Sequence, residues 1–358
     1  MDYYVREVQI GESVKKTAGS KARDDLNDIM QKLKIQAIDI PSRENKRQNS
    51  IGIQKILEHF RIIKIWESQL KVLKENDRIF IQFPVIEHSV LFASFLKRLQ
   101  KRGTKVILII HDLELLRFSK REDIKYRTRL RLRVEENDVL KCCNQIIVHN
   151  DKMKKFLKTK GIDENKMIVL KLFDYLIPQF DYLKTNRNKA KKEDPIIIAG
   201  ALKKHKAGYI YKISDRLSVN LYGIGYETCD KKNLNYKGAF KPDELPYIME
   251  GSFGLVWDGV SAKTCEGIYG NYLRVNNPHK TSLYLASGIP VIIWKEAALA
   301  DFIEKQHCGI LVDSIDDITE KIKKMSDQEY CEIQKNVCDI GKKIRDGYFY
   351  KKALESVK

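Results

Sequence analysis

The stretch 276–294 reads NNPHKTSLYLASGIPVIIW, and its residues predict a short helix followed by a buried strand. Asn277 is a good N-cap, and Pro278 suits the first helical position, where no amide hydrogen is needed. Gly288 can end the helix in a left-handed conformation. We therefore expect a helix over about 278–287 that leads directly into an apolar strand, which is the repeating unit of a parallel α/β fold.

Lys280 gives the same helix start a second interpretation. We place it at the third helical position, where a cation is unfavourable beside the positive end of the helix dipole. The first-turn amides of His279, Lys280 and Thr281 attract an anion, and the dipole adds to that attraction. A bound phosphate and a purely structural cap therefore both remain open from local physics alone.

Short apolar runs alternate with helical stretches on both sides of this junction, which favours parallel sheets. A charged segment poor in apolar residues, 181–194, divides the alternation into two halves of similar size. We therefore expect two Rossmann-like domains, over 1–180 and 195–340, with 181–194 as the linker. A final helix over 341–358, interrupted near 345–350, is expected to return to the first domain. The strand-like runs are 3–10, 36–41, 78–84, 105–110, 145–150, 167–173, 196–202, 219–225, 253–259, 289–294 and 309–315.

Composition indicates a water-soluble protein in a reducing compartment. The chain has 358 residues, of which 43% are hydrophobic and 32% charged, and it holds no apolar run long enough for a membrane span. The N-terminus lacks the apolar core of a signal peptide. Seven scattered cysteines without metal-binding spacing suit free thiols in a cytoplasm.

The net charge is unevenly distributed along the chain. Of the total of +18, residues 1–194 carry +15. Such a basic half suits nucleic acid, an anionic membrane surface or a phosphorylated acceptor. The segment 117–133, RFSKREDIKYRTRLRLR, mixes arginine with leucine, so it can rest on anionic headgroups or form a solvated helix. No aromatic-basic reading motif is present, and we expect no nucleic acid partner.

Several candidate binding residues follow predicted strands of the second half, where ligands of parallel sheets bind. Asp258 ends the run 253–259, and a loop rich in glycine and tyrosine leads from it to the helix. Tyr272 in this loop can contact sugar hydroxyls, with ordinary packing as the alternative. The same two interpretations apply to Tyr269 and Asn276.

The run 196–202 is followed by a basic turn. Gly200 permits a close approach of a ligand, and Lys203, Lys204 and Lys206 stand near the turn. A pyrophosphate beside them and a solvated basic turn are both compatible with this pattern. Neither GxGxxG nor a P-loop occurs, so no dinucleotide cofactor is expected.

In the first half, Gly11 and Thr17 stand on a small polar loop that we expect to face the cleft between the domains. His111 and Asp112 end the strand 105–110, and they can act as a general base with its orienting group or as a structural pair. No two aspartates stand at D-x-D spacing, so we expect neither a metal nor another cofactor.

The runs FGLVWDG, YLRVNNPHKTSLYLASGIPVIIW and ALADFI resemble the bacterial β-1,6-galactofuranosyltransferase family. In the first half, IIHDLELLRF, QIIVHNDKMKKFL and LKLFDYL resemble the same family. A more distant resemblance, in FGLVW and the GIPVI region, is to the streptococcal glucosyltransferase that extends GlcNAc on serine-rich adhesins. Together these runs span nearly the whole chain. The resemblance implies a GT-B fold, with an acceptor-binding domain first and a nucleotide-sugar-binding domain second, facing each other across a cleft.

The resemblance also implies roles for individual residues. Lys280 would hold the donor diphosphate, with Asn277, His279 and Thr281 at the same helix start. Lys204 stands where the distant relative has an arginine for the same phosphates. Phe240 falls near the uracil position, and Thr17 would approach the diphosphate.

The implied enzyme transfers galactofuranose from a UDP-sugar to a glycan carried on undecaprenyl diphosphate, in O-antigen or capsule synthesis. It would be cytoplasmic and peripheral at the inner face of the cell membrane, and it can form homo-oligomers as related proteins do. Inversion at the anomeric carbon needs a base, for which we select Asp112 or His111. Asp258 and Glu266 have the spacing of the paired acids of some retaining enzymes, which is the alternative stereochemistry. Glucose transfer from UDP-glucose to a glycoprotein and a role as a non-catalytic UDP-binding partner subunit also remain open.

Overall fold

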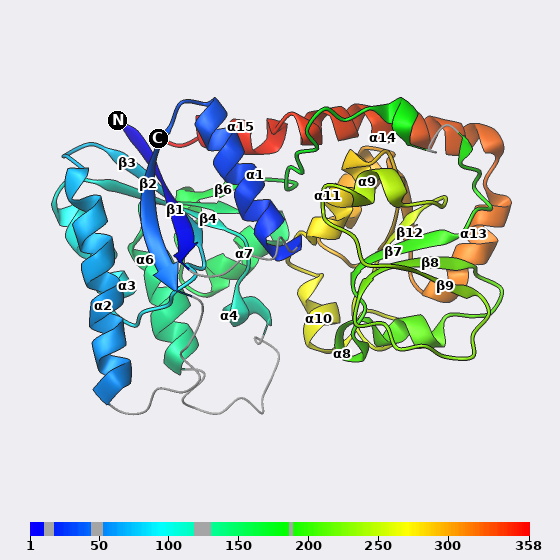
Figure 1. Ribbon diagram of the computed structural model, residues 1–358, viewed down its shortest axis with the longest axis horizontal. Helices are drawn as coiled ribbons and strands as arrows, with labels where there is room; N and C mark the ends of the chain where they lie inside the picture. Colours follow the sequence, from blue (N-terminus) through cyan, green and yellow to red (C-terminus); the bar gives the residue numbers. More distant parts are fainter. Residues whose placement is uncertain (11–17, 44–52, 118–129, 186–188) are drawn as a thin grey trace. The chain divides into compact units, whose positions relative to one another are not determined.

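The computed structural model describes residues 1–10, 18–43, 53–117, 130–185 and 189–358 (Figure 1). These residues form two compact units, each built around one sheet. The first unit comprises residues 1–10, the described parts of 26–170 and residues 353–358. The second comprises residues 18–25 and the described parts of 171–352.

The first unit contains a parallel sheet of six strands in the order β2-β1-β3-β4-β5-β6. Its strands are rich in isoleucine, valine and phenylalanine, and β4 is buried on both faces over five consecutive residues, as expected for a central parallel strand. The strands are β1 Asp2–Ile10, β2 Gln36–Arg43, β3 Arg78–Phe83, β4 Lys105–Ile110, β5 Gln145–Val148 and β6 Met167–Val169.

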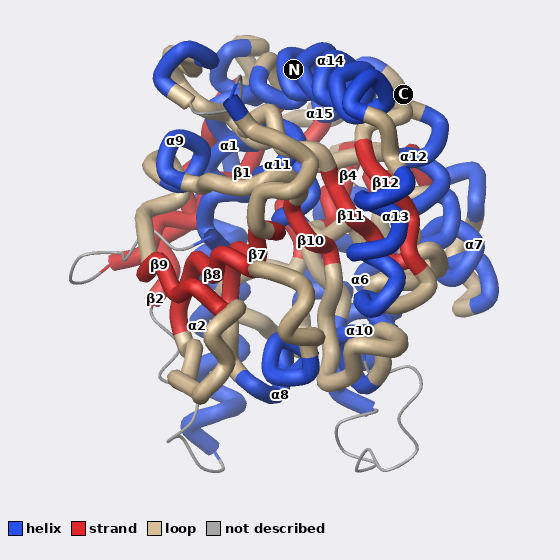
Figure 2. Tube along the Cα trace, turned by 90° about the vertical axis from the view of Figure 1, so that its right-hand side faces the viewer, coloured by secondary structure: helices blue, strands red, loops and turns tan. Residues whose placement is uncertain are grey.

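The second unit contains a parallel sheet of six strands in the order β12-β11-β10-β7-β8-β9, which can be followed in Figure 2. This is the doubly-wound order in which the winding direction reverses between β7 and β10, and such a reversal opens a ligand site beyond the strands' carboxyl ends. The strands are β7 Ile196–Ala201, β8 Val219–Ile224, β9 Leu234–Gly238, β10 Gly254–Val256, β11 Val291–Trp294 and β12 Gly309–Val312.

Helices connect the strands in both units, as a right-handed βαβ fold requires. In the first unit, α2 packs on β2 and α3 on β4. The helices before residue 180 are α1 Ala18–Lys32, α2 Ile53–Gln69, α3 Phe92–Lys101, α4 Glu114–Arg117, the π-helical turn Arg133–Asn137, α6 Asp138–Cys142 and α7 Asp151–Thr159. Those after it are α8 Lys204–Ala207, α9 Leu245–Ile248, α10 Gly267–Tyr272, α11 His279–Ala286, α12 Ala300–Lys305, α13 Ile318–Lys324, α14 Asp327–Arg345 and α15 Tyr348–Glu355.

All the strand-like runs contain a strand of the structure, but two details differ from the expectation. The run 167–173 is a strand only over Met167–Val169, because the segment after it leaves the sheet and enters the second unit. The strand β9 was not expected from LNYKG, since it is a mostly exposed edge strand with few apolar residues. The expected interruption near 345–350 is real: α14 ends at Arg345, and Gly347 has a φ of 73° before α15 begins.

The units divide the chain at residue 170, whereas we expected a domain to end at 180. Residues 171–180 belong to the second unit because their backbone and side chains bond within it: the Tyr175 hydroxyl donates to Pro242 O at 2.8 Å, and Leu176 N donates to Asp25 at 3.0 Å. Residues 353–358 belong to the first unit, where Arg78 donates to Val357 O at 3.0 Å.

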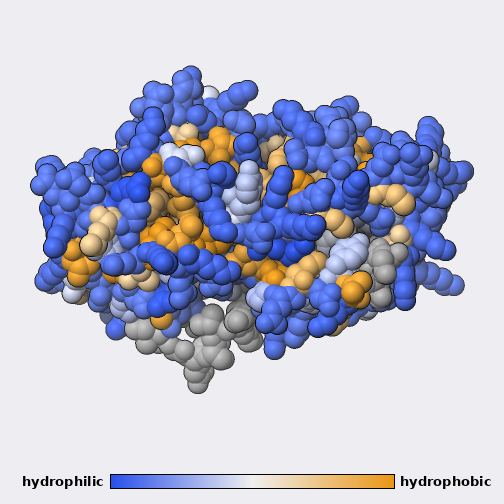
Figure 3. Space-filling view, turned by 90° about the horizontal axis from the view of Figure 1, so that it is seen from above, coloured by the Kyte–Doolittle hydropathy of each residue, from blue (hydrophilic) through white to orange (hydrophobic). Residues whose placement is uncertain are grey.

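The surface and the cysteines fit the composition. The face drawn in Figure 3 is mainly hydrophilic, with apolar side chains gathered in a few patches. All seven cysteines are free thiols, and Cys143 is fully buried in the core. Within the described residues, we find no helix of the length and apolarity that crossing a membrane requires.

Candidate functional site

The strongest candidate site lies in the second unit, where the sheet changes winding direction. The strands β7 and β10 are neighbours there, and their carboxyl ends carry the loops that hold Gly200 and Asp258. Two regions selected from the sequence, the basic turn after β7 and the helix after β10, are thus brought to one edge of one sheet. This is the position at which doubly-wound sheets bind their ligands.

The helix α11 is fixed over this edge by Tyr284. Its hydroxyl accepts a hydrogen bond of 2.8 Å from the backbone amide of Ala199 on β7. The Tyr284 ring lies against Gly254 on β10, where a Cβ atom would come within 2.3 Å of the ring. A glycine at 254 is therefore required for this contact. Lys280, four residues earlier on the same helix face, is carried to the carboxyl end of β10.

The start of α11 differs from the expectation by one residue. Pro278 occupies the N-cap position and no side chain caps the helix, so Lys280 is the second helical residue and not the third. Asn277 does not cap: its buried amide donates to Lys171 O at 3.0 Å. The Thr281 amide, which we expected to be free, donates to Pro278 O at 2.9 Å. The amides of His279 and Lys280 have no acceptor among the described residues.

Lys280 forms a buried ion pair with Asp258. Its ammonium donates to Asp258 Oδ1 and to Trp257 O, both at 2.9 Å, and the two side chains are 16% and 10% exposed. The cation that seemed misplaced at a positive helix end thus has a carboxylate partner in the structure itself. An ammonium has three donors, and the third donor of Lys280 has no partner in the described part of the chain.

Two further polar atoms at this helix start are buried and unpartnered. His279 Nε2 and Thr281 Oγ1 are shielded from solvent, and neither has a hydrogen-bond partner among the described residues. Burial, with a smaller contribution from the Lys21 ammonium, lowers the pKa of His279 to about 4. His279 is therefore neutral at physiological pH. A buried polar atom without a partner is rare in folded proteins, so these two atoms point to a ligand or an ordered water.

The turn after β7 provides exposed charge. Gly200 has a φ of 130°, and nothing lies within 4 Å of where its Cβ would be, so the backbone there is open to a close approach. Lys204 begins the four-residue helix α8, and its ammonium lies 2.5 Å from Glu227 and 5.3 Å from the Tyr211 ring centroid. Both partners of that ion pair are more than half exposed, so it is easily exchanged for another anion.

The other residues selected in this unit have mixed environments. Tyr272 is buried at the end of α10, which agrees with a packing role. The ring centroid of Tyr269 lies 5.7 Å from that of His205. Phe240 follows β9 and is half-buried, and its ring centroid lies 6.2 Å from that of Tyr222. Asn276 Oδ1 is buried without a partner among the described residues. Glu266 is exposed, whereas Asp258 is buried. In the sequence, these two residues have the spacing of the paired acids of some retaining enzymes.

In the first unit, His111 and Asp112 follow β4 as expected, and each bonds to a residue that the sequence did not single out. His111 Nε2 lies 2.7 Å from Gln82 Oε1, and the Gln82 amide in turn donates to Asn27 at 2.7 Å. Because the Gln82 oxygen can only accept, His111 Nε2 carries a proton. The Asp112 carboxylate accepts from the amide of Leu113 and from Arg117. Gln82 is therefore an orienting group of His111, a role that we expected of Asp112.

Three partners in this region were missed from the sequence. Gln82 is a buried polar residue within the apolar run RIFIQF, and that contrast was an available signal. Arg117 lies little more than one helical turn after Asp112. Glu136 is buried, and its two carboxylate oxygens accept from the amides of Glu114 and Leu115 at 2.9 and 2.7 Å. No sequence pattern indicates this last contact, because 22 residues separate the carboxylate from the first amide.

Some expectations fall on residues that the structure does not describe. Gly11, Thr17 and most of the basic segment 117–133 are among them. Two surface hollows of about 490 and 620 Å³ hold none of the selected residues. Among the described residues, no group of three or more histidine, cysteine, aspartate or glutamate side chains is placed to hold a metal ion.

Comparison with protein families covers almost the entire chain. The model of the Glucosyltransferase 3-like N-terminal domain matches residues 2–172, and that of the corresponding C-terminal domain matches residues 196–357. The β-1,6-galactofuranosyltransferase WbbI of Escherichia coli (strain K12) is 34% identical over 346 residues, which is 96% of this chain and 95% of that protein. Glucosyltransferase 3 of Streptococcus gordonii is 25% identical over 280 residues, 78% of each chain.

Comparison with solved structures identifies the fold. The apo form of the lipopolysaccharide outer core galactosyltransferase WaaB superposes with a TM-score of 0.62 over 99% of both chains, at 10% sequence identity. At that identity the likeness concerns the fold alone. The expected GT-B class, with two Rossmann-like units, is confirmed.

Proposed function

The chain belongs to the family of glycosyltransferases that includes the E. coli β-1,6-galactofuranosyltransferase, and from this premise we propose that it transfers galactofuranose from a UDP-sugar to a glycan acceptor. Its membership makes it a glycosyltransferase. The donor sugar, the acceptor and the stereochemistry belong to the proposal. The acceptor we propose is a glycan linked to undecaprenyl diphosphate, in the synthesis of a cell-surface polysaccharide.

The observation that carries the proposal is the set of unused donors at the start of α11. The third donor of the Lys280 ammonium and the amides of His279 and Lys280 have no acceptor among the described residues. A diphosphate has oxygens for all three, and the helix dipole favours it there. Lys204, on the turn after the neighbouring strand β7, adds a second cation for the same phosphates.

The remaining selected residues of this unit have secondary roles in the proposal. Gly200 leaves backbone space beside the phosphates, and Phe240 contacts the uracil ring. His279 Nε2 and Thr281 Oγ1, both buried and without partners among the described residues, bond to the donor. Tyr272 supports the loop between Asp258 and the helix. Thr17, to which the resemblance gives a contact with the diphosphate, and Gly11 lie outside the described residues.

The chemistry that follows is a direct displacement at the anomeric carbon. The acceptor hydroxyl oxygen forms a bond to C1 while the bond from C1 to the diphosphate oxygen breaks, and UDP leaves with the electron pair. The negative charge that grows on UDP is stabilised by Lys280 and the helix amides, so no metal is needed for that task. The hydroxyl proton passes to Asp112 or His111 acting as general base.

The test of the proposal is a donor screen. Purified protein is incubated with UDP-galactofuranose, UDP-galactose and UDP-glucose and simple glycoside acceptors, and products are identified by mass and NMR. We expect transfer from UDP-galactofuranose with a β-linked product. Turnover with none of these donors, despite UDP binding, would support a non-catalytic partner subunit instead.

A second candidate is glucose transfer to a glycoprotein. It is favoured by the 25% identity to the streptococcal Glucosyltransferase 3, which is weaker than the identity to the galactofuranosyltransferase. When a GlcNAc-bearing glycopeptide is added to the acceptors of that screen, this candidate predicts turnover only with UDP-glucose and the glycopeptide.

The choice of base is tested separately. Asp112→Asn and His111→Ala are compared for turnover at saturating donor, and the base is the residue whose loss lowers turnover about 10²–10⁴-fold. Full turnover in both variants would remove both residues from the mechanism.

A further inference from the structure

A buried glutamate from a distant segment of the first unit holds the start of α4. Glu136 is 3% exposed, and its two carboxylate oxygens accept from the amides of Glu114 and Leu115 at 2.9 and 2.7 Å. These amides belong to the first two residues of α4, and the first amides of a helix have no acceptor within the helix itself. Glu136 therefore caps α4 from outside the helix.

Asp112 stands where the sequence itself would place that cap. A capping aspartate ordinarily accepts from the amides two and three residues after it. For Asp112 these are the amides of Glu114 and Leu115, and Glu136 has taken both. Asp112 accepts instead from the adjacent amide of Leu113 at 2.9 Å, and its side chain is 39% exposed. The Asp112 carboxylate is thus left at the surface and is not turned onto the helix.

A π-helical turn brings Glu136 to this position. The turn Arg133–Asn137 buries two consecutive glutamates, Glu135 and Glu136, and such turns are rare and frequent at functional sites. Burial raises the pKa of Glu136 to about 7 against the effect of the two amides, and the nearby Glu114 and Asp112 carboxylates raise it further. The stability of α4 does not require this buried carboxyl, because Asp112 could cap the helix.

We propose that Glu136 is a positioning residue for Asp112 as the general base. By accepting from both amides at the start of α4, Glu136 keeps the Asp112 carboxylate available to the hydroxyl of the acceptor. Glu136 itself touches no substrate and takes no proton in the reaction. The inference rests on the proposed function, in which Asp112 is one of two candidate bases.

The test is a double-mutant cycle between Glu136→Gln and Asp112→Asn. Glutamine keeps the size of the side chain, but its NH₂ group cannot accept, so one amide of α4 is released and Asp112 turns to it. We expect kcat to fall about 10–10²-fold, with the KM of the UDP-sugar unchanged. In the Asp112→Asn background, Glu136→Gln should change kcat by less than about twofold, because it acts through Asp112.

A rescue variant separates positioning from a general structural role. Glu114→Pro removes one of the two amides, and proline suits the first position of a helix. In Glu136→Gln/Glu114→Pro, the glutamine oxygen accepts from Leu115 and no released amide remains for Asp112. We expect kcat to return to within about threefold of wild type. Turnover is divided by the concentration of UDP-binding sites, so that unfolded protein is not counted.

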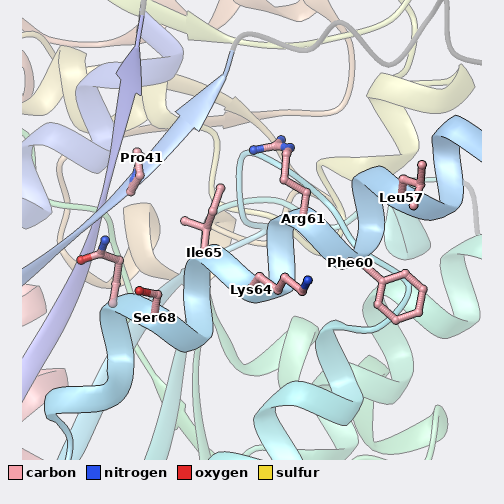
Figure 4. A pocket seen from close by; sticks show the side chains of 8 residues that line it. Pro41, Leu57, Phe60, Arg61, Lys64, Ile65 and Ser68 are labelled. Carbon is pink, nitrogen blue, oxygen red and sulfur yellow. The ribbon is translucent and has the colours of Figure 1, made fainter.

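Two control variants in the same unit should keep the wild-type kcat. Asp77→Asn alters another buried carboxylate, which is 6% exposed and accepts from the amide of Lys74 at 2.7 Å, just before β3 begins. Glu58→Gln makes the same change of charge at an exposed position. Glu58 pairs with Arg61 at 2.7 Å, beside the hollow of about 490 Å³ on α2 that Figure 4 shows.

Three results would overturn the proposal. They are a wild-type kcat in Glu136→Gln, an equal fold-loss from Glu136→Gln with and without the Asp112 carboxylate, and an equal loss in Asp77→Asn. Failure of the proposed function gives a different pattern. Asp112→Asn alone would then keep the wild-type kcat, which removes Asp112 from the mechanism and this role of Glu136 with it.

Discussion

The ends of strands β4 and β10 both carry an aspartate bound to a cation, but the two pairs differ in burial. Asp112 and Arg117, after β4, are 39% and 25% exposed. Asp258 and Lys280, after β10, are only 10% and 16% exposed. An exposed pair contributes little to stability, whereas breaking a buried pair leaves an uncompensated charge in a poorly solvated place. The buried pair is therefore the one whose charge balance a bound anion would alter.

The largest effect is expected from Lys280→Met, which removes the ammonium and keeps much of the side-chain volume. Turnover should fall about 10²–10³-fold, because the charge developing on the leaving diphosphate loses its principal cation. Lys204→Met, which removes the second cation proposed for the phosphates, is compared with it and should lower turnover far less, because water screens the charge of the exposed Lys204 ammonium. An equal loss in both variants would contradict the special position of Lys280.

Asp258→Asn removes the negative charge of the buried pair and leaves Lys280 in place. Because Lys280 would keep its charge without a carboxylate, the free energy of unfolding should fall by about 3 kcal/mol. UDP should stabilise this variant more than wild type, since a diphosphate replaces the missing anion. Both effects are measured by urea unfolding with and without UDP. Asp215→Asn, which breaks the exposed pair with Lys231, is the control and should change neither quantity appreciably.

The next largest effect is the pH dependence of stability that Glu136 causes. Its carboxylate accepts from the amides of Glu114 and Leu115, which follow Asp112 in the chain. Burial raises the pKa of Glu136 from 4.5 to about 7, although the two bound amides oppose the change. A raised carboxyl pKa stabilises the fold fully below pH 4.5, and this stability is lost as the pH rises through 7. Between about pH 5 and 8, wild type should therefore lose about 2–3 kcal/mol relative to Glu136→Gln.

Urea unfolding of both proteins across that pH range measures this difference. Comparison with Glu136→Gln is needed because Asp174, another buried carboxyl, has a pKa raised to about 8 by burial and titrates in the same range. Parallel pH profiles for the two proteins would show that Glu136 ionises normally.

The smallest effect is expected from Arg117→Met. The exposed pair with Asp112 should contribute less than about 1 kcal/mol to the free energy of unfolding, which urea unfolding measures. A loss near that of Asp258→Asn would remove the distinction between the two strand ends.

Local patterns in the sequence predicted the elements well where one physical rule dominated. The run KVILII is a strand because its continuous apolar residues fit only a doubly covered parallel sheet. Gly288, with a φ of 76°, ends α11 as its missing Cβ allows. The polar edge strand β9 and the one-residue shift at Pro278 escaped prediction, because edge strands need little apolar surface and helix ends differ little in free energy.

The candidate site was predicted in its residues and less well in its contacts. Lys280 and Asp258 were each selected from the sequence, but as parts of separate motifs, and the 22 residues that separate them hide their ion pair. For the same reason the sequence suggested Asp112 as the orienting group of His111, its neighbour in the chain. The polar Gln82 stood out in its apolar run, but nothing in the sequence paired it with His111 or paired Arg117 with Asp112.

By itself, the sequence determined the α/β class, the division into two halves and the approximate position of every strand except β9, because periodicity, capping and chain breakers act over a few residues. The tertiary structure alone decided which strand ends become neighbours, and therefore which charges meet. The order of β7 and β10 in the sheet and the contact of Tyr284 with Gly254 bring Lys280 to Asp258. Coulombic interaction and burial depend on distance in space, and residue spacing along the chain does not encode that distance.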